Sequence, residues 1–219
     1  MTELSISTDH GTLSATLNVP DNAHCALLLA HGAGADHKHA HMESLASAFA
    51  LAGIATLRFN FPFKEQGRTR VDSKSVSIDC IVSAVETLQS KTQLPMFAGG
   101  HSFGGRMVTH AVADKKIECY GMILCSFPLH PAGKPGTDRA AHFNNLNQPV
   151  LFLSGTRDAL ADSALLSEQV DKLLSADSKL HWLDTADHGF KVLKRTRKNE
   201  MDVYQEAAGV AAAFTTAAI

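Results

Sequence analysis

The sequence predicts an α/β fold, in which a mostly parallel sheet is flanked by helices. Short strand patterns alternate with helical patterns along most of the chain, which requires crossover connections between parallel strands. Several strand patterns are continuous apolar runs, as expected where helices cover both faces of a sheet. With 219 residues, of which 45% are hydrophobic and 19% charged, the chain fits one globular domain spanning residues 1–219.

The first two strand patterns differ from the others because polar and apolar residues alternate in them. They cover residues 4–8 and 12–18, and Gly11 favours a turn between them, so we expect an N-terminal antiparallel hairpin. The later strands are expected at 25–30, 54–59, 96–98, 120–126, 150–154 and 180–183. The helices are expected at 42–51, 72–89, 103–113, 164–174 and 201–214. Residues 128–142, rich in Pro and Gly, are expected to be irregular.

The overall charge argues against two classes of partner. Twenty basic and 22 acidic side chains give a formal net charge of −2, which favours neither nucleic acid nor an anionic membrane. No signal peptide is visible, and no stretch approaches the ~20 apolar residues of a spanning helix. The four cysteines have no metal-site spacing and are expected to be reduced and mostly buried. We therefore expect a soluble, cytoplasmic protein.

The segment Gly100-His101-Ser102-Phe103-Gly104 has the G-x-S-x-G pattern of a nucleophile elbow. Such a turn between strand and helix exposes the serine hydroxyl above the sheet, and its glycines leave room for the neighbouring strand and helix. By chance the pattern occurs in roughly one chain in fifteen of this length, so an ordinary glycine-rich turn is the alternative. An apolar strand before it and an apolar helix after it favour Ser102 as a nucleophile.

A nucleophilic serine requires two N–H donors for the oxyanion that its attack creates. The first donor is expected to be Phe103, directly after the serine. The second is expected from the glycine-rich segment 31–34, where we select Ala33. Simple chain reversal is the alternative role of this segment, but its place at a strand end, ahead of the elbow, favours the donor role.

Two further side chains that follow predicted strands complete a candidate catalytic triad. Asp158 and His188 each come just after a strand, so both are expected at the carboxyl edge of the sheet, where Ser102 also lies. The chain order serine, acid, histidine is that of hydrolases with a nucleophile elbow. Asp184 and Asp187 are rival acids, but Asp187 adjoins the base and is expected to point away from its Nδ1. We place Asp158 first.

Several strings, in this order, make the chain resemble compact dienelactone-hydrolase-like α/β-hydrolases with a serine nucleophile and no large lid. The strings are HGAG, RFNFP, GGHSFGGR, PLHPAGKP, SGTRD and DHGF, within residues 27–190. The resemblance implies an α/β-hydrolase fold with Ser102, His188 and Asp158 as the triad. Dienelactone hydrolases proper carry cysteine as the nucleophile, so the resemblance does not extend to their activity.

Together these features predict a serine hydrolase that cleaves a small acyl ester or thioester through an acyl-enzyme intermediate. No metal or organic cofactor is required, and the expected partner is a small-molecule acyl substrate. An acyltransferase or peptidase would share the triad. A catalytically silent hydrolase-like interaction module is the other alternative, and its expected mark is the loss of a triad residue.

The short connection after Ser126 leaves no room for a large lid domain, so we expect an open pocket. The candidate substrate contacts are His130, in this connection, and Arg58, Arg106 and His101. The two arginines are suited to binding an anionic group. For the two histidines the alternative is packing or solvent exposure, and for the two arginines it is a place on the solvated surface or at a helix terminus.

Two short runs, one rich in histidine and one rich in lysine and arginine, are expected to have structural roles and not to bind a metal or a partner. His37, His39 and His41 suggest a metal site, but no carboxylate or thiolate completes one at a recognisable spacing, so a polar start to the following helix is favoured. Residues 194–198 form a basic cluster that could bind a partner. Their place before the closing helix, and the net charge, favour a solvated loop.

Overall fold

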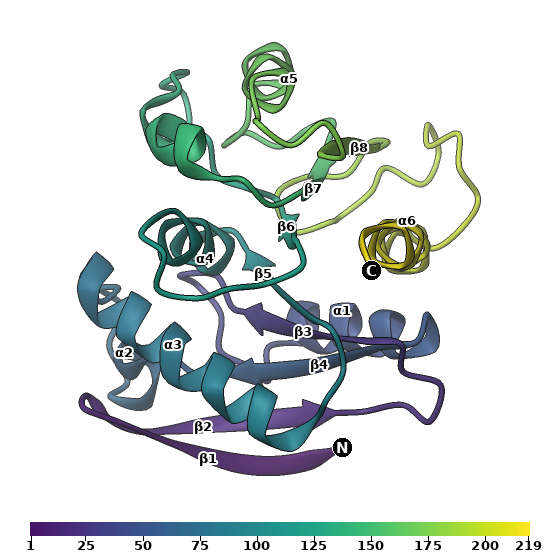
Figure 1. Cartoon of the computed structure of the whole chain (residues 1–219). Coiled ribbons are helices and arrows are strands. Elements are labelled where there is room, and N and C mark those ends of the chain that lie inside the picture. The colour runs from purple at the N-terminus through teal and green to yellow at the C-terminus, as the bar shows by residue number, and fades with distance from the viewer.

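The computed structural model describes residues 1–219 and contains one eight-stranded sheet (Figure 1). Its strands are β1 (Thr2–Thr8), β2 (Gly11–Asn18), β3 (Cys25–Ala30), β4 (Ile54–Phe59), β5 (Met96–His101), β6 (Met122–Cys125), β7 (Val150–Gly155) and β8 (Lys179–Leu183). Their order across the sheet is β1-β2-β4-β3-β5-β6-β7-β8. β2 pairs antiparallel with β1 and β4, and all other neighbours are parallel. The predicted fold class and N-terminal hairpin are confirmed.

Seven helices flank this sheet, and two of them were not predicted. They are α1 (Ala40–Leu51), α2 (Pro62–Glu65), α3 (Lys74–Lys91), α4 (Phe103–Ala113), the 3-10 helix η1 (Asp138–Asn145), α5 (Ser163–Asp171) and α6 (Val203–Ala218). The four-residue helix α2 is too short to show a helical period, although Pro62 at its first position suits a helix start. The helix η1 begins inside the segment that was expected to be irregular.

The two faces of the sheet carry separate cores. In β3, Ala26, Leu28 and Ala30 belong to the core beneath α3 and α4, whereas Cys25, Leu27 and Leu29 belong to the core beneath α1 and α6 (Figure 1). All six side chains are buried. A strand that is covered on both faces has no polar side, which explains the continuous apolar run in the sequence.

Two further sequence expectations concern the cysteines and membrane segments. All four cysteines are free, and three of them are buried, as predicted. Burial raises the pKa of the Cys125 thiol to about 12. None of the helices combines the length and the apolar character that crossing a membrane requires.

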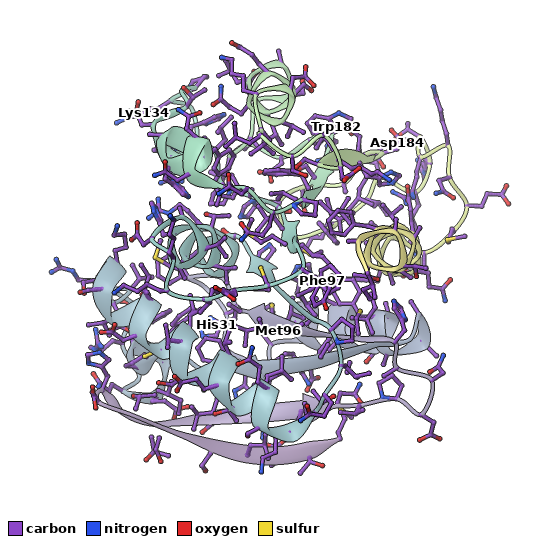
Figure 2. The ribbon with its side chains drawn as sticks, viewed as in Figure 1. His31, Met96, Phe97, Lys134, Trp182 and Asp184 are labelled. Atoms are coloured by element: carbon purple, nitrogen blue, oxygen red, sulfur yellow. The ribbon has the colours of Figure 1, made fainter.

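The central strand β5 approaches its neighbours so closely that two of its positions accept only glycine. A Cβ atom on Gly99 would lie 2.0 Å from the carbonyl oxygen of Ile123 in β6. A Cβ atom on Gly100 would lie 2.3 Å from the carbonyl oxygen of Ala30 in β3. On one face of this strand Phe97, labelled in Figure 2, packs against Phe214 of α6. The sheet is therefore tightest where β5 leads into the elbow.

We expect alanine to have opposite effects at two glycines. Gly99→Ala forces a side chain into the backbone of β6 and should destabilise the protein by about 1–3 kcal/mol or more. Gly209, exposed in α6 with open space around it, lacks such a neighbour. Gly209→Ala should therefore stabilise the protein by about 0.5–1 kcal/mol through helix propensity. Urea denaturation of both variants measures these changes in the free energy of unfolding. A Gly99→Ala variant as stable as Gly209→Ala would contradict the close approach of β5 and β6.

Candidate active site

Ser102 occupies a strained turn between β5 and α4. Its backbone angles are φ 52° and ψ −117°, a conformation that costs a non-glycine residue about 1–3 kcal/mol. A Cβ atom on Gly104 would lie 2.4 Å from the carbonyl oxygen of Ala30, the same oxygen that excludes one from Gly100. Both elbow glycines therefore make room for the end of β3. The predicted elbow geometry is present, and it holds the serine at the carboxyl edge of the sheet.

The structure brings Ser102, His188 and Asp158 into one hydrogen-bonded line. The Nε2 atom of His188 lies 2.8 Å from Ser102 Oγ. On the other side of the ring, Nδ1 lies 2.8 Å and 3.0 Å from the two carboxylate oxygens of Asp158. A carboxylate can only accept, so Nδ1 carries the proton and Nε2 is free to accept one from the serine.

Asp158 is held in this line by its own loop. Its side chain is completely buried, and its Oδ1 also accepts a hydrogen bond from the Leu160 N–H at 2.8 Å. The loop is attached to the loop that carries His188, because the Arg157 N–H donates to the Ala186 carbonyl at 2.9 Å. The loops that carry Asp158 and His188 are therefore positioned against each other by a backbone contact.

The two rival acids have other roles. Asp187 accepts hydrogen bonds at Oδ1 from the N–H groups of Gly189 and Lys191, which closes the turn around the base. Asp184 accepts one from the Lys198 N–H at 2.9 Å. Both carboxylates thus support loop backbone, and Asp158 is the carboxylate that contacts the His188 ring.

The predicted oxyanion donors belong to the turn after β3 and to the first residue of α4. Gly32 to Ala35 form a turn closed by the Ala35 N–H and the Gly32 carbonyl at 3.1 Å, and the Ala33 N–H at its tip has no acceptor within the protein. Phe103 is the first residue of α4, so its N–H has no acceptor within the helix. Both groups remain available to a ligand.

His31, which the sequence did not single out, anchors the start of this turn. Its Nδ1 donates to the Gly32 carbonyl at 2.8 Å, and its Nε2 accepts from the Phe61 N–H at 3.1 Å. The ring, labelled in Figure 2, makes edge-to-face contacts with both Phe61 and Phe63. Burial lowers the pKa of His31 to about 4, so the ring is neutral and makes both hydrogen bonds at neutral pH.

A cavity of about 680 Å³ adjoins Ser102. Its wall is formed by the turn after β3, the start of α1, the end of β5 with Ser102, the loop around His188 and one side chain of α6. The lining residues are Gly32, Ala33, Gly34, Ala35, His39, Ala40, His41, Ser44, His101, Ser102, His188, Gly189, Phe190, Lys191 and Tyr204. The predicted nucleophile, base and Ala33 therefore share one cavity.

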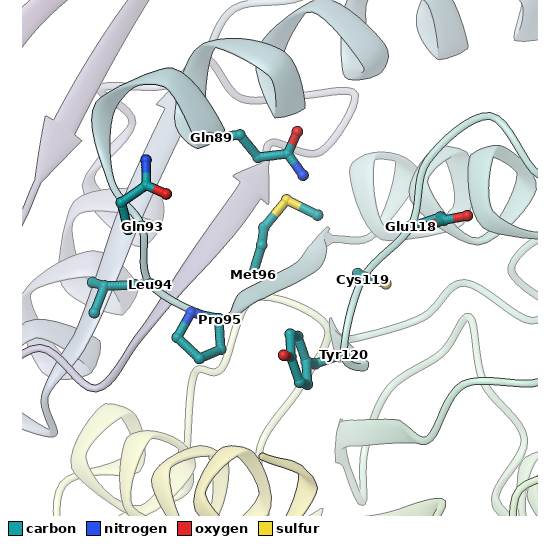
Figure 3. A pocket seen from close by; sticks show the side chains of 8 residues that line it. All are labelled: Gln89, Gln93, Leu94, Pro95, Met96, Glu118, Cys119 and Tyr120. Carbon is teal, nitrogen blue, oxygen red and sulfur yellow. The ribbon is translucent and has the colours of Figure 1, made fainter.

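Figure 3 shows a second cavity, of about 620 Å³, on the side of the sheet opposite to Ser102, where the parallel strands begin. It lies where β5 begins, and Met96, Cys119 and Tyr120 line it. None of the predicted site residues belongs to it. Ser102 and His188 line the other cavity.

Of the four predicted substrate contacts, only His101 lines the cavity beside Ser102. Arg58 is buried and donates to the His37 carbonyl at 2.6 Å. His130 is buried and joins two backbone groups, the Pro131 carbonyl and the Asp162 N–H. Arg106 is half-buried on α4, away from the lining of this cavity. The structure therefore does not bring Arg58, Arg106 or His130 to this cavity.

The histidine run is only partly a polar helix start. His39 caps α1 and accepts a hydrogen bond from the His41 N–H at 3.2 Å, as that interpretation requires. His37 pairs with Asn60 at 2.8 Å. For His41 the interpretation is wrong, because this side chain is buried and packs against His101. No group of three or more His, Cys, Asp or Glu side chains is arranged to hold a metal ion.

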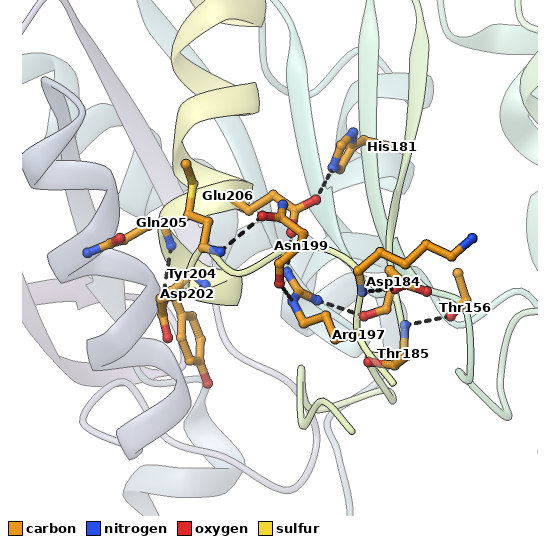
Figure 4. A network of polar contacts seen from close by, with 12 residues as sticks. Thr156, His181, Asp184, Thr185, Arg197, Asn199, Asp202, Tyr204, Gln205 and Glu206 are labelled. Atoms are coloured by element: carbon orange, nitrogen blue, oxygen red, sulfur yellow. Dashed lines mark hydrogen bonds and ion pairs between the residues drawn. The ribbon is translucent and has the colours of Figure 1, made fainter. Parts of the chain in front are cut away.

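The predicted solvated loop at 194–198 contains one buried side chain, Arg197 (Figure 4). Its guanidinium pairs with Glu206 of α6 and donates to the carbonyls of Asp184 and Asn199, at 2.6 Å and 3.0 Å. Glu206 also contacts His181 of β8 at 2.8 Å. Arg197 therefore ties the loop after the base to α6, and it has a structural role.

This fold and this arrangement define an α/β-hydrolase. The chain belongs to the family described as "Alpha/beta hydrolase domain", whose profile matches residues 23–216.

Three solved structures illustrate the similarity. A dienelactone hydrolase from Anabaena variabilis is 20% identical, with a TM-score of 0.79 and coverage of 99% of this chain and 96% of that one. Est1E from Butyrivibrio proteoclasticus, with ferulic acid bound, is 16% identical, with a TM-score of 0.76 and coverage of 98% and 99%. XC6422 from Xanthomonas campestris, a serine hydrolase without lid, is 18% identical, with a TM-score of 0.68 and 86% coverage of both chains. At these identities the similarity shows the fold.

The strain at Ser102 makes a prediction about stability that is independent of activity. Ser102→Gly removes a strain of about 1–3 kcal/mol, offset by the ~0.5–1 kcal/mol entropy cost of glycine, whereas Ser102→Ala keeps the strain. We therefore expect the glycine variant to be more stable than the alanine variant by about 1 kcal/mol in urea denaturation. If the glycine variant proved less stable, the backbone at Ser102 would not be strained.

Proposed function

We propose that this protein is a serine hydrolase that cleaves small acyl esters or thioesters through an acyl-enzyme intermediate. The observation that supports this most strongly is the line from Asp158 through His188 to Ser102, with a separation of 2.8 Å on each side of the imidazole. A serine hydroxyl in contact with an oriented, unprotonated imidazole nitrogen is an activated nucleophile.

In the first half of the proposed reaction, Ser102 becomes acylated. His188 Nε2 takes the hydroxyl proton while Oγ forms a bond to the acyl carbon, and the carbonyl electron pair moves onto oxygen. The N–H groups of Ala33 and Phe103 stabilise this oxyanion. When the oxyanion collapses, the bond to the alcohol or thiol breaks, and the leaving group takes the proton from His188.

In the second half, water attacks the acyl-enzyme and the same steps release the acid. His188 accepts a proton from water as the water oxygen attacks the acyl carbon, and the second oxyanion uses the same two donors. Its collapse breaks the bond to Ser102 Oγ, which recovers its proton from His188. Asp158 remains ionised throughout, holds the Nδ1 proton and stabilises the imidazolium in each half.

The surroundings of Ser102 support a small substrate. The cavity of about 680 Å³ is within the size range of small-molecule pockets. Between β6 and β7 the chain forms only the helix η1 and short connecting segments, so no lid domain encloses a long acyl chain. Est1E shares the fold and binds ferulic acid, so esters of small carboxylic acids are the first substrates to assay.

The proposal predicts covalent labelling of one residue. Wild-type protein should react with a fluorophosphonate probe and hydrolyse short p-nitrophenyl or thioester substrates, and Ser102→Ala should do neither. Mass spectrometry of the peptides locates the adduct. Folded wild-type protein that neither reacts nor hydrolyses any ester would favour the silent interaction module, and labelling combined with transfer to an added amine or alcohol would favour an acyltransferase.

A second prediction separates the proposed acid from a rival. Asp158→Asn leaves an amide that can donate to Nδ1 and so favours the wrong tautomer of His188, which should lower kcat by about 10³–10⁴-fold. Asp184→Asn is the matched control, since it also replaces a carboxylate after a strand end and should change kcat by less than about threefold. Comparable losses in the two variants would contradict the role of Asp158.

A further inference from the structure

The His101 side chain lies between the two loops that flank Ser102. A Cβ atom on Gly32 would lie 2.8 Å from its Nδ1, so the ring is packed directly against the turn that carries Ala33. Its Nε2 lies 2.9 Å from the backbone carbonyl oxygen of His188. One ring therefore contacts both the donor turn and the backbone of the proposed base.

The contact with His188 determines which nitrogen of His101 carries the proton. A carbonyl oxygen can only accept, so Nε2 is protonated and donates to it, and Nδ1 is left as an acceptor. That Nδ1 is buried and has no hydrogen-bond partner. Burial lowers the pKa of His101 to about 4, so the ring is neutral at neutral pH.

The His41 ring packs against His101. The two ring centroids are 4.4 Å apart, and Nε2 of His41 is likewise buried without a partner. Its Nδ1 lies 2.9 Å from the Tyr204 hydroxyl, and burial lowers the pKa of His41 to about 3. The contact between the two imidazole rings is T-shaped and involves no hydrogen bond, so it holds His101 in place by packing.

The neutrality of this cluster suits the proposed chemistry. The ionisable side chains around His101 are His39 at the N-cap of α1, His41 of α1, and Asp158 and His188 from the loops after β7 and β8, and Tyr204 of α6 contacts His41. The rings of His101 and His188 are 5.1 Å apart, so a charged His101 would oppose the imidazolium that the proposed reaction forms. A neutral donor can hold the base without that repulsion.

We propose that His101 is a positioning residue for His188, acting through the hydrogen bond from its Nε2 to the His188 carbonyl while its ring is packed against the donor turn and His41. This inference rests on the proposed function, because the role is defined by the reaction that His188 serves. The hydrogen bond from His101 holds the backbone of His188, whose side chain must meet Ser102 Oγ at 2.8 Å. A displacement of the base by about 1 Å is enough to cost up to about 100-fold in rate.

The test compares His101→Gln with His101→Leu. The glutamine amide can donate to the same carbonyl, whereas leucine fills the space without a donor. We expect the leucine variant to lose about 10- to 100-fold in kcat for p-nitrophenyl acetate with KM within about twofold, and the glutamine variant to recover most of the loss. Rates of fluorophosphonate labelling should follow kcat. His24→Leu removes a histidine that contacts Thr215 of α6, outside the cavity, and should leave kcat unchanged.

Two kinetic results would overturn this inference while leaving the proposed function intact. In the first, the leucine variant retains the wild-type kcat. In the second, kcat falls equally in the leucine and glutamine variants, which would show that the hydrogen-bond donor at position 101 does not position His188. A wild-type protein that neither labels nor hydrolyses is instead a failure of the proposed function.

A readout independent of turnover is provided by ¹⁵N-histidine spectra. His101 should be neutral with the proton on Nε2, and His41 should be neutral. The downfield His188 Nδ1–H signal, from its contact with Asp158, should persist in His101→Gln and broaden in His101→Leu. A His101 proton on Nδ1, or a His188 signal unaffected by leucine, would contradict the positioning role even in an inactive protein.

Discussion

The carbonyl oxygen of Ala30, at the end of β3, is approached from two sides by the backbone of the elbow. Cβ atoms on Gly100 and Gly104 would lie 2.3 Å and 2.4 Å from it, so the strand before Ser102 and the helix after it both close on this one group. This contact places the strained serine directly beside the turn that follows β3. The relative position of nucleophile and donor turn, and with it the geometry of the site, depends on this close approach.

The remaining parts of the site reach Ser102 because parallel strands end at a common edge. The loops after β7 and β8 carry Asp158 and His188, and the contact between Arg157 N–H and the Ala186 carbonyl joins them. The turn after β3 is held separately, by His31 within a group of phenylalanine rings. His101 is the side chain that links the donor turn to the base loop. Preorganisation of this kind is what makes electrostatic stabilisation of an oxyanion effective.

Much of this could be predicted from the sequence, for identifiable reasons. The central strands are buried on both faces, so their continuous apolar runs are visible without any alignment, and Ser102, Asp158 and His188 could be placed because each follows such a strand. The direction in which long side chains point could not be predicted from the sequence. Whether Arg58, His130 or His41 turns toward the cavity depends on packing between segments far apart in the chain, and local patterns do not record it. The same limit hid His31 and Tyr204, and helices α2 and η1 were missed because short helices lack a periodic signal.

In the site that we propose, the triad of Ser102, His188 and Asp158 and the two backbone donors form one preorganised unit. The most direct measurement is a crystal structure of the protein after reaction with a fluorophosphonate. We predict phosphorus bonded to Ser102 Oγ, a phosphoryl oxygen within hydrogen-bond distance of the N–H groups of Ala33 and Phe103, and His188 still paired with Asp158. An adduct on another residue, or a phosphoryl oxygen that contacts neither donor, would contradict the account.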